Sequence, residues 1–224
     1  MSSIADKAIV SPQMALRPPT FGDWLACGDI SRIVRTMPMA GEEAIEFRTN
    51  EGAVLRWMMA ATGLSEADIE AVPAPVGRAI YLRLVDTVPA MAYAKANKDD
   101  PVSMHADGLE IKLSEPLPGP RQTYGTIKLR PPTFGDVISA GDITTTRVLK
   151  STALGNGDPA TEEVINPEAV GRWFLRLSNL PLPIISLMAY RDAWIAFAHL
   201  RPLIEEITHG NFEEPSSTSG SVAA

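Results

Sequence analysis

Cysteine is almost absent from this chain of 224 residues, in which Cys27 is the only one. A single cysteine cannot form an intramolecular disulfide or a tetrathiolate metal site, and this usage fits a cytosolic protein best. Histidine is scarce as well: His105, His199 and His209 are scattered, and none lies at the four-residue helical spacing of a zinc site. We therefore expect no metal and no cofactor.

Positive charge and long apolar runs are also in short supply. Lys and Arg number 20 against 27 Asp and Glu, which gives a net charge of −7 and a pI near 5.0, whereas nucleic-acid binding needs a basic surface that neutralises phosphates. The most apolar region, 180–200, contains Pro181, Pro183, Arg191 and Asp192, which a membrane-spanning helix tolerates poorly. The first residues lack the basic start and apolar core of a secretory signal. No nucleic-acid partner, membrane span or export signal is expected.

What the sequence does contain is a repeat. The phrase LRPPTFGD at Leu16–Asp23 recurs letter for letter at Leu129–Asp136, and the stretches 16–30 and 129–143 differ at only four of fifteen positions. Both the chain length and the spacing of the repeat suit two units of ordinary domain size. The sequence therefore predicts a duplication.

The repeated phrase indicates the end of an extended segment and the start of a helix. Its two prolines hold the chain extended, and Thr20 with Asp23 has the spacing of a capping box, as has Thr133 with Asp136. The carboxylate then lies in the first helical turn, where the helix dipole favours negative charge. Each such cap contributes about 1 kcal/mol. We interpret the phrase as scaffolding.

Hydrophobic periodicity predicts several further elements. Helices are expected over 52–62, from Ser65 onwards, over 76–88 and along the apolar stripe 170–177, and the alternation in LEIKLSE and YGTIKLR predicts a hairpin before the second phrase. The expected domain boundaries are 8–96 for the first unit, 97–108 for a polar linker, 109–209 for the second unit and 210–224 for a disordered tail. The fold class predicted is α+β and mainly α-helical. Each unit is expected to be a short hairpin or strand followed by a helical bundle, with a pseudo-twofold axis relating the two.

Catalytic chemistry has little support in these residues. The acidic pairs Asp23/Asp29 and Asp136/Asp142 repeat, but the first member of each pair already has a capping role, and no third group orients either pair. We therefore expect no enzyme. The alternative is an enzyme or small-molecule binder built by duplication, with Asp23 and Asp136 facing each other across the pseudo-twofold.

Aromatic and arginine side chains indicate protein–protein contact instead. Trp57 and Trp173 occupy equivalent positions, and each follows an arginine. Core packing is the ordinary role of such residues, yet Trp and Arg are also enriched in protein interfaces. The candidate partner-binding residues are Arg17, Arg130, Trp57, Trp173 and Trp194.

These motifs, in this order along the chain, are similar to those of a known family. A hairpin of the type IKLSEP…YGTIKLRPPTFGD, a capped helix, an Arg-Trp helix and a TGLSEADIEAV segment resemble the phage tail assembly chaperones of Mu-like contractile-tailed viruses. The residues that match the family's Leu-Arg-x-Pro-x-x-x-Asp element and its Thr-Gly-Leu-Ser turn are Leu129, Arg130, Pro132 and Asp136, then Leu16, Arg17, Pro19 and Asp23, and Thr62, Gly63, Leu64 and Ser65. The chain departs from the family in having two units and in replacing the acidic SEADIEAV by the apolar PLPIISLM in its second half.

The resemblance implies a non-enzymatic role in phage tail assembly. Such chaperones bind the long helical tape measure protein and keep it soluble while the tail tube assembles around it. The implied location is the host cell cytoplasm, or the virion tail if the chain is retained there. Besides the tape measure protein, the candidate partners are tail tube or baseplate proteins and a second copy of the chain. The alternative reading is a structural component that stays in the finished tail or baseplate.

Overall fold

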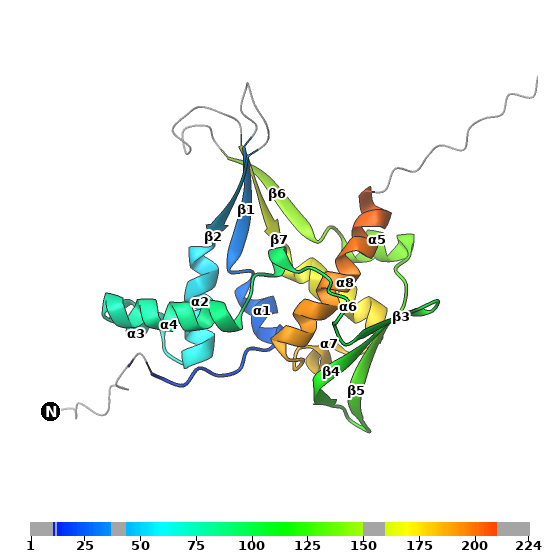
Figure 1. The fold of residues 1–224 in the computed structure, drawn as a ribbon, viewed down its shortest axis with the longest axis horizontal. Helices are drawn as coiled ribbons and strands as arrows, with labels where there is room; N and C mark the ends of the chain where they lie inside the picture. Colours follow the sequence, from blue (N-terminus) through cyan, green and yellow to red (C-terminus); the bar gives the residue numbers. More distant parts are fainter. Residues whose placement is uncertain (1–10, 12, 37–43, 150–159, 210–224) are drawn as a thin grey trace, which may run out of the picture.

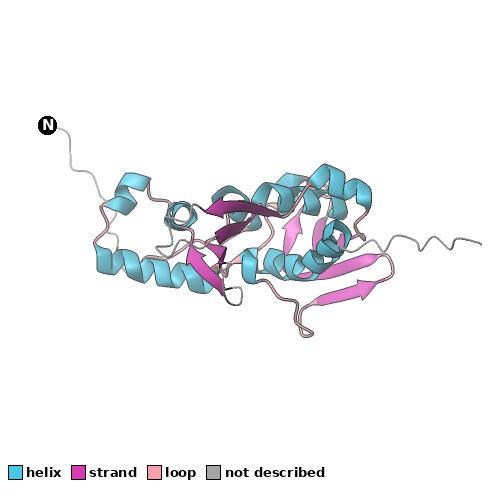
Figure 2. Ribbon diagram, turned by 90° about the horizontal axis from the view of Figure 1, so that it is seen from above, coloured by secondary structure: helices cyan, strands magenta, loops and turns pink. Residues whose placement is uncertain are grey.

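The computed structural model describes residues 11, 13–36, 44–149 and 160–209. In chain order, its elements are α1 (Phe21–Cys27), β1 (Ser31–Thr36), β2 (Ala44–Thr49), α2 (Glu51–Thr62), α3 (Glu66–Glu70), α4 (Ala74–Thr87), the 3-10 helix η1 (Met91–Tyr93), β3 (Val102–His105), β4 (Gly108–Pro118), β5 (Thr123–Leu129), α5 (Phe134–Ala140), β6 (Thr144–Leu149), β7 (Ala160–Ile165), α6 (Pro167–Ser178), α7 (Leu182–Ile185) and α8 (Tyr190–His209). Helices α3 and α4 lie at one end of the long axis and strands β4 and β5 at the other (Figures 1 and 2).

The duplication is visible in the order of the elements. The series α1-β1-β2-α2-α3-α4 recurs as α5-β6-β7-α6-α7-α8, and the same backbone bonds mark both copies. The N–H of Asn50 donates to the carbonyl of Ile30, and the N–H of Asn166 donates to that of Ile143, each over 2.8 Å. Each asparagine also begins the following helix, because its side chain accepts a backbone N–H three residues on.

Two hairpins, one from each unit, form a four-stranded antiparallel sheet in the order β2-β1-β7-β6 (Figure 1). The central pairing joins β1 to β7, with Ile33 opposite Glu163 and Val34 opposite Glu162. The first strand of one hairpin thus pairs with the second strand of the other. The two units therefore meet head to tail.

A second antiparallel sheet has the order β3-β4-β5. Strands β4 and β5 form the hairpin that the alternation predicts, with Ile111 opposite Ile127 and Leu109 opposite Leu129. These four side chains are buried, and the sheet packs against α6, α7 and α8. The hairpin prediction is confirmed.

One continuous core spans both units. Buried residues of the two halves form a single cluster, and ring contacts link the halves directly: Phe21 of α1 packs against Phe174 of α6 with ring centroids 4.8 Å apart. Trp57 and Tyr190 make another such contact, edge to face, at 5.7 Å. Each large apolar side chain buried in this way contributes roughly 1.5–3 kcal/mol. The units are therefore parts of one folding body.

The predicted fold class is wrong in two respects. About 46% of the described residues are helical and about 27% are in strands, so the protein is α+β but not a pair of hairpin-plus-bundle units. The hairpins β1-β2 and β6-β7 follow the capped helix rather than precede it, and they merge into one sheet. The pseudo-twofold is also wrong, because such an axis would exchange β1 with β6 and β2 with β7, whereas β1 pairs with β7.

Other sequence predictions fall on particular segments. The stretch 97–108, expected as a linker, contains strand β3, while the domain boundaries as such stay a prediction. The tail 210–224 lies outside the described residues. None of the described helices has the length and apolar character needed to cross a membrane.

Candidate partner-binding site

Each copy of the phrase folds into an arginine–aspartate clamp. Arg17 donates to the two carboxylate oxygens of Asp23 over 3.0 and 2.6 Å, and Arg130 donates to those of Asp136 over 2.7 Å each. The intervening Pro-Pro pair fixes the extended chain, so that the arginine returns to the carboxylate at the helix start. Bidentate pairs of this kind are the strong form of charge-assisted hydrogen bond.

The same aspartates also cap the helices. The Asp23 carboxylate accepts the N–H of Thr20 over 2.8 Å, and the Asp23 N–H donates to the Thr20 hydroxyl. In the second copy, Asp136 accepts both the N–H and the hydroxyl of Thr133. The four residues predicted to cap helices therefore lie at the starts of α1 and α5, where Thr20 contacts Asp23 and Thr133 contacts Asp136.

The second clamp has an additional charge. Arg176 of α6 donates to Asp136 over 2.9 Å, and the Asp136 carboxylate is buried. Hydrogen bonds from Arg130 hold the pKa of Asp136 far below its usual range, against the opposing effect of burial. For Asp23, burial raises the pKa, but the bonds from Arg17 and Thr20 outweigh it and the pKa is lowered.

Two of the candidate tryptophans are core residues rather than surface contacts. Trp57 and Trp173 are buried, and their indole N–H groups donate over 2.9 Å to the carbonyls of Gly28 and Gly141, where α1 and α5 end. Burial leaves neither ring available to a partner in this fold. The structure thus places both rings in the core, and their partner-binding role stays a prediction. Trp194 is half-buried and donates to the Ala90 carbonyl over 3.2 Å.

Asp29 and Asp142, the second members of the two acidic pairs, do not form a repeated site. Asp29 is buried and accepts the N–H groups of Ser31 and Ala92 over 3.2 and 2.8 Å, and burial raises its pKa to about 6. Asp142 is exposed and accepts the N–H of Thr144. Both acids thus shape the turn that precedes a strand.

The described residues include neither an activated cysteine nor a cluster of metal ligands. Burial raises the pKa of Cys27 to about 11, which keeps the thiol protonated and unreactive at neutral pH. Among the residues that the structure describes, no group of three His, Cys, Asp or Glu side chains could hold a metal ion.

A mainly apolar groove lies beside the second clamp, and we call it the hairpin groove. Its volume is about 360 Å³, and it runs between the end of the three-stranded sheet and the last turns of α8. The apolar side chains along it are Met104, Leu109, Leu129, Pro131, Pro132, Leu200, Leu203 and Ile207. Arg130 and Glu206 are the charged residues in its lining. Both candidate arginines are about half exposed, and Arg130 is the one that lies in the lining of this groove.

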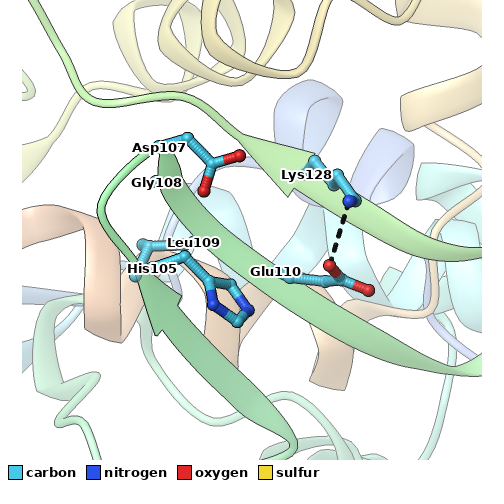
Figure 3. Close-up of a pocket in the computed structure, with 6 residues that line it drawn as sticks. All are labelled: His105, Asp107, Gly108, Leu109, Glu110 and Lys128. Atoms are coloured by element: carbon cyan, nitrogen blue, oxygen red, sulfur yellow. Dashed lines mark ion pairs between the residues drawn. The ribbon is translucent and has the colours of Figure 1, made fainter.

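A smaller hollow of about 200 Å³ adjoins this groove on the sheet (Figure 3). Glu110 and Lys128 point toward each other across β4 and β5, 3.2 Å apart, and His105 lies on the neighbouring strand β3. An exposed cross-strand ion pair of this type is ordinary sheet stabilisation. The hollow gives the groove a polar border.

Sequence reasoning missed the hairpin groove. Met104 belongs to the stretch expected as a linker, and only the structure brings it to α8. One signal was present, because Leu200, Leu203 and Ile207 follow the i, i+3, i+7 spacing of a helix face.

No protein-family model matches this chain, and no curated protein or solved structure matches it. The resemblance to phage tail assembly chaperones therefore depends on the quoted residues alone.

Proposed function

We propose that this chain is a non-enzymatic phage tail assembly chaperone, which binds the tape measure protein and keeps it soluble. The observation that carries the proposal is the hairpin groove. An open, mainly apolar groove beside a helix suits the apolar face of a second, amphipathic helix, which docks through residues spaced i, i+3 or i+4, and i+7. A long helical tape measure protein offers many such faces.

The chemistry of the groove fits transient binding. Its apolar lining is short, and the Arg130 guanidinium at its side is already held by Asp136 while remaining half exposed. A prepositioned cation costs little side-chain entropy when a partner carboxylate approaches. Binding of moderate affinity is what a chaperone needs, because the tail tube must later displace it.

Co-expression with a phage tape measure protein, followed by size-exclusion chromatography, tests this role. The groove variant is Met104→Lys, since Met104 is largely exposed and its replacement should leave the fold intact. The matched control is Leu182→Lys on α7, an exposed leucine outside the groove. We expect a soluble complex with the wild type and the control, and its loss with Met104→Lys. Failure of the wild type to solubilise the tape measure protein would overturn the proposal, and equal binding by both variants would overturn the groove.

A structural component retained in the tail or baseplate is the second candidate. The observation that favours it is that β2 and β6, at the ends of the four-stranded sheet, pair with no further strand in the part of the chain that the structure describes, because such edges can join copies of a protein. Mass spectrometry of purified particles separates the two roles. A chaperone is absent from them, whereas a tail component is present.

A further inference from the structure

The head-to-tail junction between the two units uses one side of the first unit. Strand β1 pairs with β7 there, and the pairing is reinforced by ion pairs between Arg32 and Glu162 and between Arg35 and Glu163, each over 2.8 Å. Helix α1 joins the same contact, since Phe21 packs on Phe174 of the second unit. Together, β1 and α1 form what we call the donor side. The surface of the second unit that contacts them consists of β7, α6 and Ser186 after α7, and we call it the acceptor side.

The second unit carries the same donor side, but in the described residues nothing covers it. Strand β6 is the counterpart of β1 and ends the sheet, and α5 is the counterpart of α1 (Figure 1). Phe134 of α5 is 65% exposed, whereas its counterpart Phe21 is fully buried. Ile138 of α5 and Val148 of β6 are 73% and 77% exposed. The phenylalanine that is buried at the internal junction is thus open in the second unit, and two further apolar side chains are exposed beside it.

A glycine supports the same interpretation. Gly22 of α1 is required by the internal junction, because a Cβ there would lie 2.9 Å from both Cβ and the carbonyl oxygen of Ser186. Gly135 is its counterpart in α5, where a Cβ would meet only the Thr133 hydroxyl at 3.7 Å. The described structure therefore gives no steric reason for glycine at 135. A close approach by another copy would supply one.

The corresponding edge of the first unit also pairs with no further strand among the described residues. Strand β2 is the counterpart of β7 and forms the other end of the sheet. Ile45 and Phe47, on one face of β2, are about half exposed. Ile45 and Phe47 alternate with the charged Glu46 and Arg48, which pair with each other. The β2 edge thus offers apolar side chains to a further strand, besides charges of the kind that usually protect an edge.

We propose that the β6 edge and α5 of one copy dock on the β2 edge of a second copy and extend the sheet from molecule to molecule. The register follows from the internal junction. Placing β6 where β1 lies and β2 where β7 lies sets Arg147 opposite Glu46 of the second copy, and Val148 opposite Ile45. This register pairs opposite charges with each other and apolar side chains with each other.

This register is specific. A slip of one residue in either direction would place Arg147 opposite Ile45 or Phe47 and would separate both matched pairs, because adjacent strand residues point to opposite faces. Arg147 already contacts Glu162 of its own sheet. In the extended sheet it would lie between two glutamates, Glu162 and Glu46 of the second copy.

The contact joins two different surfaces, so it is heterologous and propagates. Heterologous contacts close into rings or continue as filaments, and do not stop at a symmetric dimer. The acceptor segment of the first unit, Glu66–Glu70, is acidic where the second unit has the apolar Leu182–Ile185. We therefore expect the contact between copies to be weaker than the internal one, so that assembly depends on concentration. This inference does not depend on the proposed function.

Multi-angle light scattering of the purified full chain over a range of concentrations tests the assembly. The interface variant is Val148→Lys, because an edge lysine blocks strand addition. The matched control is Met104→Lys, at a residue of similar exposure on β3, a strand of the other sheet. The wild type and the control should form species larger than dimers as concentration rises, while Val148→Lys stays monomeric with an unchanged circular dichroism spectrum. A wild type that is monomeric throughout, or a Val148→Lys variant that assembles like the control, would overturn the proposal.

Disulfide trapping tests the register. In a Cys27→Ala background, Ile45→Cys with Val148→Cys should give a ladder of covalent oligomers on mild oxidation. The two positions cannot bond within one chain, since three strand spacings, about 14 Å, separate them. The control pair, Glu46→Cys with Val148→Cys, places the thiols on opposite faces and should give little product. Equal ladders from both pairs, or none from either, would contradict the proposed register.

Discussion

Arg130 and Asp136 are joined by two hydrogen bonds of 2.7 Å, and Arg176 donates a third to the same carboxylate. In the first copy of the phrase, Ala60 stands where Arg176 does, so Asp23 has one arginine partner instead of two. The two clamps thus differ in strength although the repeated phrases are identical, because Arg176 lies outside the phrase. Both act as scaffolding, as the sequence predicts, since clamp and cap use the same carboxylate.

The first prediction concerns the unequal clamps. Asp136→Asn removes the counterion of two arginines and a buried acceptor, and we expect the free energy of unfolding to fall by about 2–3 kcal/mol, below the 3–5 kcal/mol of a fully buried pair because both arginines are partly exposed. Asp23→Asn should cost about 1 kcal/mol, since it removes one partly exposed pair and a cap. Urea unfolding of both variants measures the difference. Equal losses would mean that Arg176 contributes nothing.

The second prediction concerns pH and Asp29. Burial raises the pKa of Asp29 from 3.8 to about 6 in the folded state, so the folded protein holds this proton more tightly than the unfolded chain does. Its contribution to stability is therefore fully present below pH 4 and is lost as the pH rises toward 6. About 3 kcal/mol is at stake, at roughly 1.4 kcal/mol for each unit of pKa.

Unfolding of the wild type and of Asp29→Asn at pH 4.5 and pH 7 measures this effect. We expect the wild type to lose stability relative to the variant between these values. Asp23 and Asp136 have lowered pKa values, so their contributions are present above pH 4 and disappear only in stronger acid. A constant difference between wild type and variant from pH 4.5 to 7 would show that Asp29 titrates outside this window.

The third prediction tests the buried tryptophans. Phe in place of Trp57 or Trp173 keeps a ring but removes the N–H donated to Gly28 or Gly141, and it leaves a small cavity. We expect a loss of about 1–3 kcal/mol of stability in each case and unchanged binding of the tape measure protein by the folded variants. Trp194→Phe, at a half-buried site, should cost less. Weakened partner binding at wild-type stability would identify these tryptophans as contact residues.

Local features of the fold were accessible from the sequence. The helix from Ala74 to Thr87 and the turn at Gly63 follow directly from apolar spacing and glycine, because helix periodicity and capping depend on residues close in the chain. The β4-β5 hairpin was accessible for the same reason, since its alternation is contained in one short segment.

The four-stranded sheet was not accessible in the same way. The sequences of β1 and β2, SRIVRT and AIEFRT, are short and rich in charge. Strand β1 is stabilised by pairing with β7, about 130 residues away in the chain. Pairing over such separations leaves no local pattern, because the arginines of β1 find their ion-pair partners only on β7. The groove depends on the same long-range placement, because Met104 meets α8 only in the folded chain.

The fourth prediction separates folding from assembly at two equivalent glycines. Gly22→Ala should lower stability by about 1–2 kcal/mol, because the added Cβ would overlap Ser186 and the overpacking outweighs the gain in helix propensity. Gly135→Ala has room within the chain, so it should raise stability slightly while it weakens self-association by crowding the next copy. Urea unfolding and light scattering on both variants measure the two effects. If Gly135→Ala assembles as well as the wild type, then α5 does not take part in the contact between copies, and the sheet edges alone must carry it.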